Sequence, residues 1–63
     1  MQHKVKDVLD LLSQHGFYET RIIGDHHRLT NDHGKYVTVS YSRLKNNIPP
    51  ETYNYILKQA GLK

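Results

Sequence analysis

The chain has 63 residues, with nine Lys or Arg against six Asp or Glu, so its net charge is +3. It contains no cysteine, which excludes disulfides and thiolate metal sites. No apolar run approaches the roughly 20 residues that span a bilayer, and the N-terminus lacks the apolar stretch of a secretory signal. We therefore expect one small, soluble, cytoplasmic domain (residues 1–63) whose basic charge suits a polyanionic partner.

Apolar residues recur at helical spacing near the N-terminus: Val5, Val8, Leu9 and Leu12. They predict an amphipathic helix over residues 3–15, with Gly16 at the position where a glycine commonly ends a helix. Aromatic and β-branched residues dominate the next segment, so residues 17–23 are predicted to form a strand.

Two turn signals divide the middle of the chain into further strands. Gly24-Asp25 makes a turn before a predicted strand over residues 26–30, and the sequence Asn-Asp-His-Gly at residues 31–34 is a strong hairpin signal. Residues 35–41 then show the clearest alternation of apolar and polar side chains, which predicts a third strand.

The last part of the chain begins with the polar, turn-like residues 42–48 and ends in a predicted helix. Pro49 and Pro50 suit the entrance of a helix that runs from about residue 50 to 60, with Gly61 as its stop. The order α-β-β-β-α predicts an α+β fold of two layers. In this fold two helices cover one face of a three-stranded antiparallel sheet and leave the other face open to solvent.

Strand alternation separates the two adjacent histidines that follow the first turn. His26 and Arg28 share one face of the predicted strand, whereas His27 and Leu29 share the other. Leu29 is the large aliphatic residue of this strand and marks the buried face. His26 and Arg28 are therefore expected on the open face, unless a bulge at the turn inverts the assignment.

The chain also carries the landmarks of one protein family, each in its expected order and spacing. They are a Gly16-Phe17 step after the first helix, a Gly24-x-His26-His27 signature, an Ile48-Pro49 helix entrance and the closing run Ile-Leu-Lys-Gln-Ala-Gly-Leu at residues 56–62. Over nearly its whole length the chain resembles the HicA-type toxins of bacterial and phage toxin–antitoxin pairs. These are small ribonucleases with a double-stranded-RNA-binding-like fold.

The resemblance implies translation-linked cleavage of mRNA and neutralisation by a HicB-type antitoxin. It assigns the catalytic role to His26, the histidine that follows the Gly-x pair. One position departs from the family, which usually has a serine where this chain has Asp25. A carboxylate there would favour a protonated imidazole but would repel a phosphate.

The chemistry of RNA cleavage fits this assignment without a metal or cofactor. It needs a base for the proton of the 2′-hydroxyl, a task that suits histidine, and a cation for the crowded phosphate, which Arg28 could supply. The alternative is that His26 only ends a strand and hydrogen-bonds the turn. His27 is expected to be a half-buried spacer. A metal site built from His26, His27 and His33 is disfavoured because adjacent strand residues point oppositely.

Further RNA contacts are expected from the turn and from a rim of basic side chains: Gly24, Lys35, Arg43, Lys45, Lys58 and Lys63. For each basic residue the alternative is a solvated surface charge. Four tyrosines are expected in the half-buried core rather than in a base-stacking site: Tyr36, Tyr41, Tyr53 and Tyr55. Two other functions stay open. One is an RNA-binding module without catalysis, and the other is an inactive member that is kept as an antitoxin partner.

Overall fold

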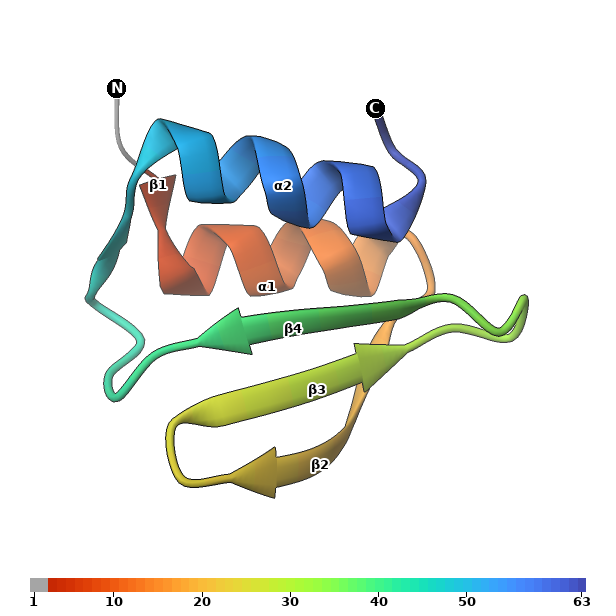
Figure 1. Cartoon of the computed structure of the whole chain (residues 1–63), viewed down its shortest axis with the longest axis horizontal. Helices are drawn as coiled ribbons and strands as arrows, with labels where there is room; N and C mark the ends of the chain where they lie inside the picture. The colour runs from red at the N-terminus through yellow and green to blue at the C-terminus, as the bar shows by residue number, and fades with distance from the viewer. Residues whose placement is uncertain (1–2) are drawn as a thin grey trace.

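The computed structural model describes residues 3–63, so the first two residues of the predicted domain lie outside the described residues. The elements follow in the order β1 (His3–Lys4), α1 (Val5–Gln14), β2 (Tyr18–Ile23), β3 (His26–Thr30), β4 (Tyr36–Ser40), β5 (Asn47–Ile48) and α2 (Pro50–Ala60). β2, β3 and β4 form an antiparallel sheet in that order, and the predicted α+β fold is confirmed. Figure 1 shows β2 as the strand farthest from both helices.

The core lies between the two helices and one face of the sheet. Its buried apolar side chains come from both layers: Val5, Val8, Leu12, Phe17, Leu29, Val37, Val39, Ile48, Ile56 and Ala60. Leu29 pairs directly with Val37 across β3 and β4, so both side chains point to the same face, as predicted for Leu29. All six residues of β2 are exposed, so this strand extends beyond the area that the helices cover.

Both helices end as the glycine pattern predicts. Gly61 follows α2 with φ 74°, and the N–H of Leu62 donates to the carbonyl of Leu57 at 2.9 Å. At the end of α1 the N–H of Phe17 donates to the carbonyl of Leu12 at 3.0 Å. These bonds satisfy carbonyls that have no partner within the helix, and a positive φ at this position favours glycine.

The prediction is wrong at the two ends of the N-terminal helix segment and in the segment before α2. Residues 3–4 are not helical but form β1, which pairs with β5 inside the predicted turn-like residues 42–48. The N–H groups of Val5 and Lys6, which begin α1, donate to carbonyls of Asn46 and Leu44. The first N–H groups of a helix have no acceptor within the helix. Here a segment distant in sequence supplies the acceptor carbonyls. The helix also ends at Gln14 rather than residue 15.

Candidate active site on the open sheet face

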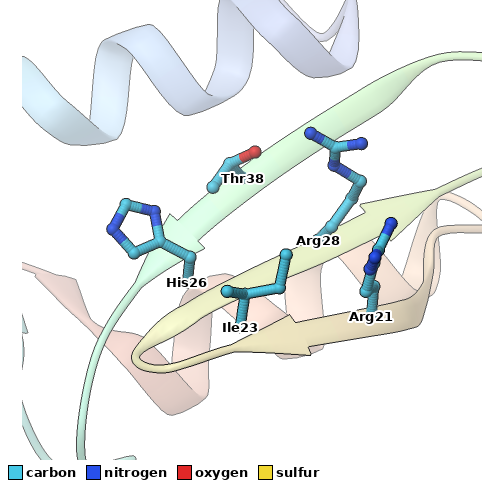
Figure 2. Close-up of a pocket in the computed structure, with 5 residues that line it drawn as sticks. All are labelled: Arg21, Ile23, His26, Arg28 and Thr38. Carbon is cyan, nitrogen blue, oxygen red and sulfur yellow. The ribbon is translucent and has the colours of Figure 1, made fainter.

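Nine side chains form the sheet surface opposite the core, which we call the open face. Cross-strand pairing identifies them, because directly opposed residues share a face: Tyr18, Arg21, Ile23, His26, Arg28, Thr30, Tyr36, Thr38 and Ser40. Five of them line an open cavity of about 450 Å³: Arg21, Ile23, His26, Arg28 and Thr38. Figure 2 shows these five on one side of the sheet, with α1 behind it.

His26 occupies the first position of β3, directly after a two-residue turn. Gly24 has φ 61°, as the first central residue of a type II′ turn requires, and this turn pairs Ile23 with His26. The His26 side chain is 66% exposed, and its Nε2 lies 3.7 Å from Oδ1 of Asp25. The imidazole is therefore open to a ligand, with one carboxylate beside it.

Two arginines face each other next to His26. Arg21 of β2 pairs with Arg28 of β3, so their guanidinium groups project from the same face on neighbouring strands. Like charges that are directly opposed destabilise a sheet, and a bound anion would relieve this repulsion. None of the nine side chains of the open face is acidic. Asp25, in the turn, places its carboxylate beside His26.

Sequence reasoning missed Arg21, although the signal was present. A two-residue turn at Gly24-Asp25 fixes the register of the hairpin, and counting back from Ile23 opposite His26 brings Arg21 opposite Arg28. The possible bulge at the turn does not occur. The register shift lies instead between Glu19 and Arg21.

His27 belongs to a separate cluster on the face toward the helices. Its Nδ1 lies 2.7 Å from Oε1 of Glu19, and its ring stacks on Tyr41 with 3.7 Å between the ring centroids. The His27 side chain is 14% exposed, which agrees with the predicted half-buried position. Burial and the nearby Glu19 carboxylate raise the pKa of Tyr41. This cluster ties β2 to β3 and does not reach the cavity around His26.

The lysines of the predicted basic rim are not among the residues that line the cavity beside His26. Lys35 lies in the β3–β4 connection, at the end of the hairpin away from His26, and its side chain lies against Gly61. Lys58 projects from the last turn of α2. Lys45 lies in the segment that follows β4. The start of this segment is joined to the Gly24-Asp25 turn, because the N–H of Tyr41 donates to the carbonyl of Asp25 at 2.9 Å. Contacts of these three lysines with RNA stay a prediction.

The tyrosine assignment was partly wrong. Tyr41 and Tyr53 are half-buried against the core, as predicted, but Tyr36 and Tyr55 are 62% and 63% exposed. Tyr36 projects from the open face, and Tyr55 from the solvent side of α2. The alternation in residues 35–41 correctly predicted that Val37 and Val39 are buried. The same alternation places Tyr36 on the opposite, exposed face.

Comparison with known protein families shows to which family the chain belongs. The family model described as the HicA toxin of bacterial toxin–antitoxin matches residues 5–62. The chain belongs to the HicA toxin family. A search of curated proteins found no match. The resemblance that the sequence landmarks predicted is confirmed, and it extends from the first residue of α1 to the residue after Gly61.

Membership in the HicA family has one consequence for partners. A toxin of this kind acts within a toxin–antitoxin system, so an antitoxin is the kind of partner that it implies.

Within residues 3–63, neither helix of this HicA-family chain is long and apolar enough to cross a membrane. In the same part of the chain, no three histidine or acidic side chains form a group that could hold a metal ion.

Proposed function

We propose that this HicA-family protein is an endoribonuclease that cleaves mRNA without a metal ion, with His26 as its catalytic residue. The observation that carries the proposal is the open face itself. There, an exposed imidazole adjoins two opposed arginines in one cavity. This combination supplies a proton-transfer group and a phosphate-binding pair at one place. Gly24 contributes by setting the tight turn that places the imidazole at the edge of the cavity.

The proposed reaction uses the RNA's own 2′-hydroxyl as the nucleophile. His26 takes the proton of this hydroxyl as its oxygen forms a bond to the adjacent phosphorus. The bond from phosphorus to the 5′-oxygen then breaks, and the 5′-oxygen gains a proton from solvent or from the imidazolium. The products are a 2′,3′-cyclic phosphate and a 5′-hydroxyl. Because the nucleophile belongs to the substrate, no metal-activated water is needed.

Arg21 and Arg28 have the complementary role of holding the phosphate. Negative charge builds up on the phosphate oxygens during the attack, and fixed guanidinium groups stabilise it without rearrangement. Lys35, Lys45 and Lys58 are proposed to contact the RNA backbone farther from the reacting phosphate. The repulsion between the paired arginines in the free protein supports this role, since phosphate binding would remove it.

The proposed partner is a HicB-like antitoxin that covers the open face. A standard interface buries about 800 Å² on each protein, which is a large share of the 4487 Å² surface of this chain. A patch of that size centred on the cavity covers His26 and Arg28 together. Carboxylates of the antitoxin would meet the two arginines in place of RNA phosphates, so binding should weaken with salt. In hydrogen–deuterium exchange, we expect protection at residues 24–30. Protection only on a distant surface, with cleavage still blocked, would contradict occlusion.

A second candidate function is RNA binding without cleavage, and the position of Asp25 favours it. The carboxylate stands 3.7 Å from the imidazole, and the family usually has a serine there. It repels a phosphate from His26, whereas Arg21 and Arg28 remain able to bind the RNA backbone. In this case the protein would act as a binding module or as an inactive partner of its antitoxin. An assay of both binding and cleavage separates these alternatives.

The test compares wild-type protein with His26→Ala and His33→Ala on a defined mRNA fragment, with and without a chelator. We expect His26→Ala to lower the cleavage rate by at least about 100-fold, which is the low end of the range for losing a general base. His33→Ala is the matched control, because it removes an exposed imidazole from the turn between β3 and β4. Unchanged cleavage by folded His26→Ala would reject the catalytic role. Loss of cleavage in chelator that added Mg²⁺ restores would reject metal independence.

A further inference from the structure

The open face carries two exposed tyrosines that the proposed reaction does not use. Tyr36 of β4 and Tyr18 of β2 both pair with Thr30 of β3, so they stand on either side of this small residue. Tyr36 is 62% exposed and Tyr18 is 52% exposed. Large aromatic side chains in such positions usually bury part of their surface, and here neither helix covers that face. Each ring therefore has surface that is exposed to a ligand.

Tyr36 is connected to the catalytic cavity through Arg28. The guanidinium carbon of Arg28 lies 5.7 Å from the centre of the Tyr36 ring, within the range of a cation–π contact. His26, Arg28 and Thr30 follow one another at alternate positions of β3. At about 3.3 Å per residue, Thr30 and its partner Tyr36 lie about 13 Å along the strand from His26. An RNA phosphate held between His26 and Arg28 therefore has Tyr36 within reach of a neighbouring nucleotide.

We propose that this surface takes unpaired RNA, with a base next to the cleaved phosphate stacked on Tyr36. The inference rests on the proposed function and specifies its substrate class. A tyrosine ring can stack only on a base whose face is uncovered, and bases in a duplex are stacked on each other. Tyr18, across Thr30, provides a second ring for the adjoining base.

Charge favours the open face over the helices as the RNA surface. The open face bears two arginines and no acidic side chain. α1 has one lysine against two aspartates, and its Lys6 is already paired with Asp10 at 3.4 Å. α2 has one glutamate and one lysine. A duplex is recognised through its phosphates and shape, which requires an extended cationic surface, and neither helix offers one.

The test measures binding in a His26→Ala background, so that RNA is not cleaved. Tyr36→Thr removes the ring but keeps a good strand former, and Tyr36→Phe keeps the ring. Tyr55→Ala is the matched control, because Tyr55 is an equally exposed tyrosine on α2. The alanine that replaces it is a good helix former, so the helix should be kept. The probes are a short unpaired oligoribonucleotide and a blunt RNA duplex of the same composition. A fluorescent adenine analogue in the unpaired strand reports stacking through quenching.

We expect Tyr36→Thr to weaken binding of the unpaired strand by about 5- to 150-fold, the range for losing one base stack, and to reduce the quenching, because the Tyr18 ring remains. Tyr36→Phe and Tyr55→Ala should bind like the parent, and the duplex should bind more weakly than the unpaired strand. Equal affinity of folded Tyr36→Thr and Tyr55→Ala, or preference for the duplex, would overturn the inference.

The two proposals fail separately. Stacking on Tyr36 in a protein whose wild-type form does not cleave RNA would support the substrate class and reject the endoribonuclease. Cleavage that depends on His26 but is indifferent to Tyr36→Thr would support the reaction and reject the stacking site.

Discussion

Replacing Asp25 by serine tests how its carboxylate affects the site. Oδ1 of Asp25 lies 3.7 Å from Nε2 of His26, and the Asp25 side chain is 62% exposed. If a phosphate oxygen accepts a hydrogen bond of about 2.8 Å from the other ring nitrogen of His26, it lies roughly 7 Å from the carboxylate. In a water-like medium, two unit charges at about 7 Å repel each other by about 0.6 kcal/mol. We therefore expect Asp25→Ser to raise kcat/KM by about threefold at low salt.

The assay is single-turnover cleavage of one unpaired RNA by wild-type protein, Asp25→Ser and Asp25→Asn. Asp25→Asn removes the charge at nearly constant shape, and Asp32→Asn makes the same change in the β3–β4 connection, away from the cavity. The gain should vanish near 1 M salt, where charges are screened over about 3 Å. A gain as large in Asp32→Asn would assign the effect to net charge alone. A fall in activity with either Asp25 variant would refute the repulsion and indicate that Asp25 orients His26.

The remaining predictions concern stability. Glu19→Gln removes the charged partner of His27 and should cost less than about 1 kcal/mol in urea unfolding, because the Glu19 side chain is 39% exposed; a larger loss would mean that the contact contributes as a buried ion pair does. Folding raises the pKa of Tyr41 above 10.0, mainly by burial, so its stabilising contribution is complete below pH 10.0 and disappears as pH rises through the folded-state pKa. Tyr41→Phe should therefore flatten the alkaline decline of Tm, and an unchanged decline would contradict this. Leu12→Ala, at a fully buried site, should cost about 2–5 kcal/mol, against the roughly 3–9 kcal/mol expected for a chain of this size. A smaller cost would show that the core closes around the missing side chain.

The sequence predicted most of the fold because its strongest signals are local. Helical spacing, turn glycines and strand alternation each act over a few residues, and they placed both helices and all three strands of the main sheet. β1 and β5 were missed for the complementary reason. Each has two residues, too few for an alternating pattern, and their pairing of His3 with Ile48 joins distant parts of the chain.

The candidate site was predicted in part. Parity placed His26 and Arg28 together, and the structure brings both to one cavity. The prediction that Arg21 joins this site also requires the strand register that the two-residue turn imposes. The position of Glu19 could not be read from the pattern, because every residue of β2 is exposed and no apolar face reveals an added residue in the strand.

That irregularity in β2 shapes both faces of the sheet. Glu19 and Arg21 are two residues apart, so in a regular strand they would share a face, and a carboxylate would stand beside the arginine pair. The register shift between them leaves Glu19 opposite Leu29 and Arg21 opposite Arg28. An added residue in one strand sends the side chains on either side of it to opposite faces. Glu19 is thereby directed to His27 on the side toward the helices, where it ties β2 to β3. Arg21 stays opposite Arg28 without an acidic neighbour on its own strand face, and the pair keeps the positive charge that a phosphate requires.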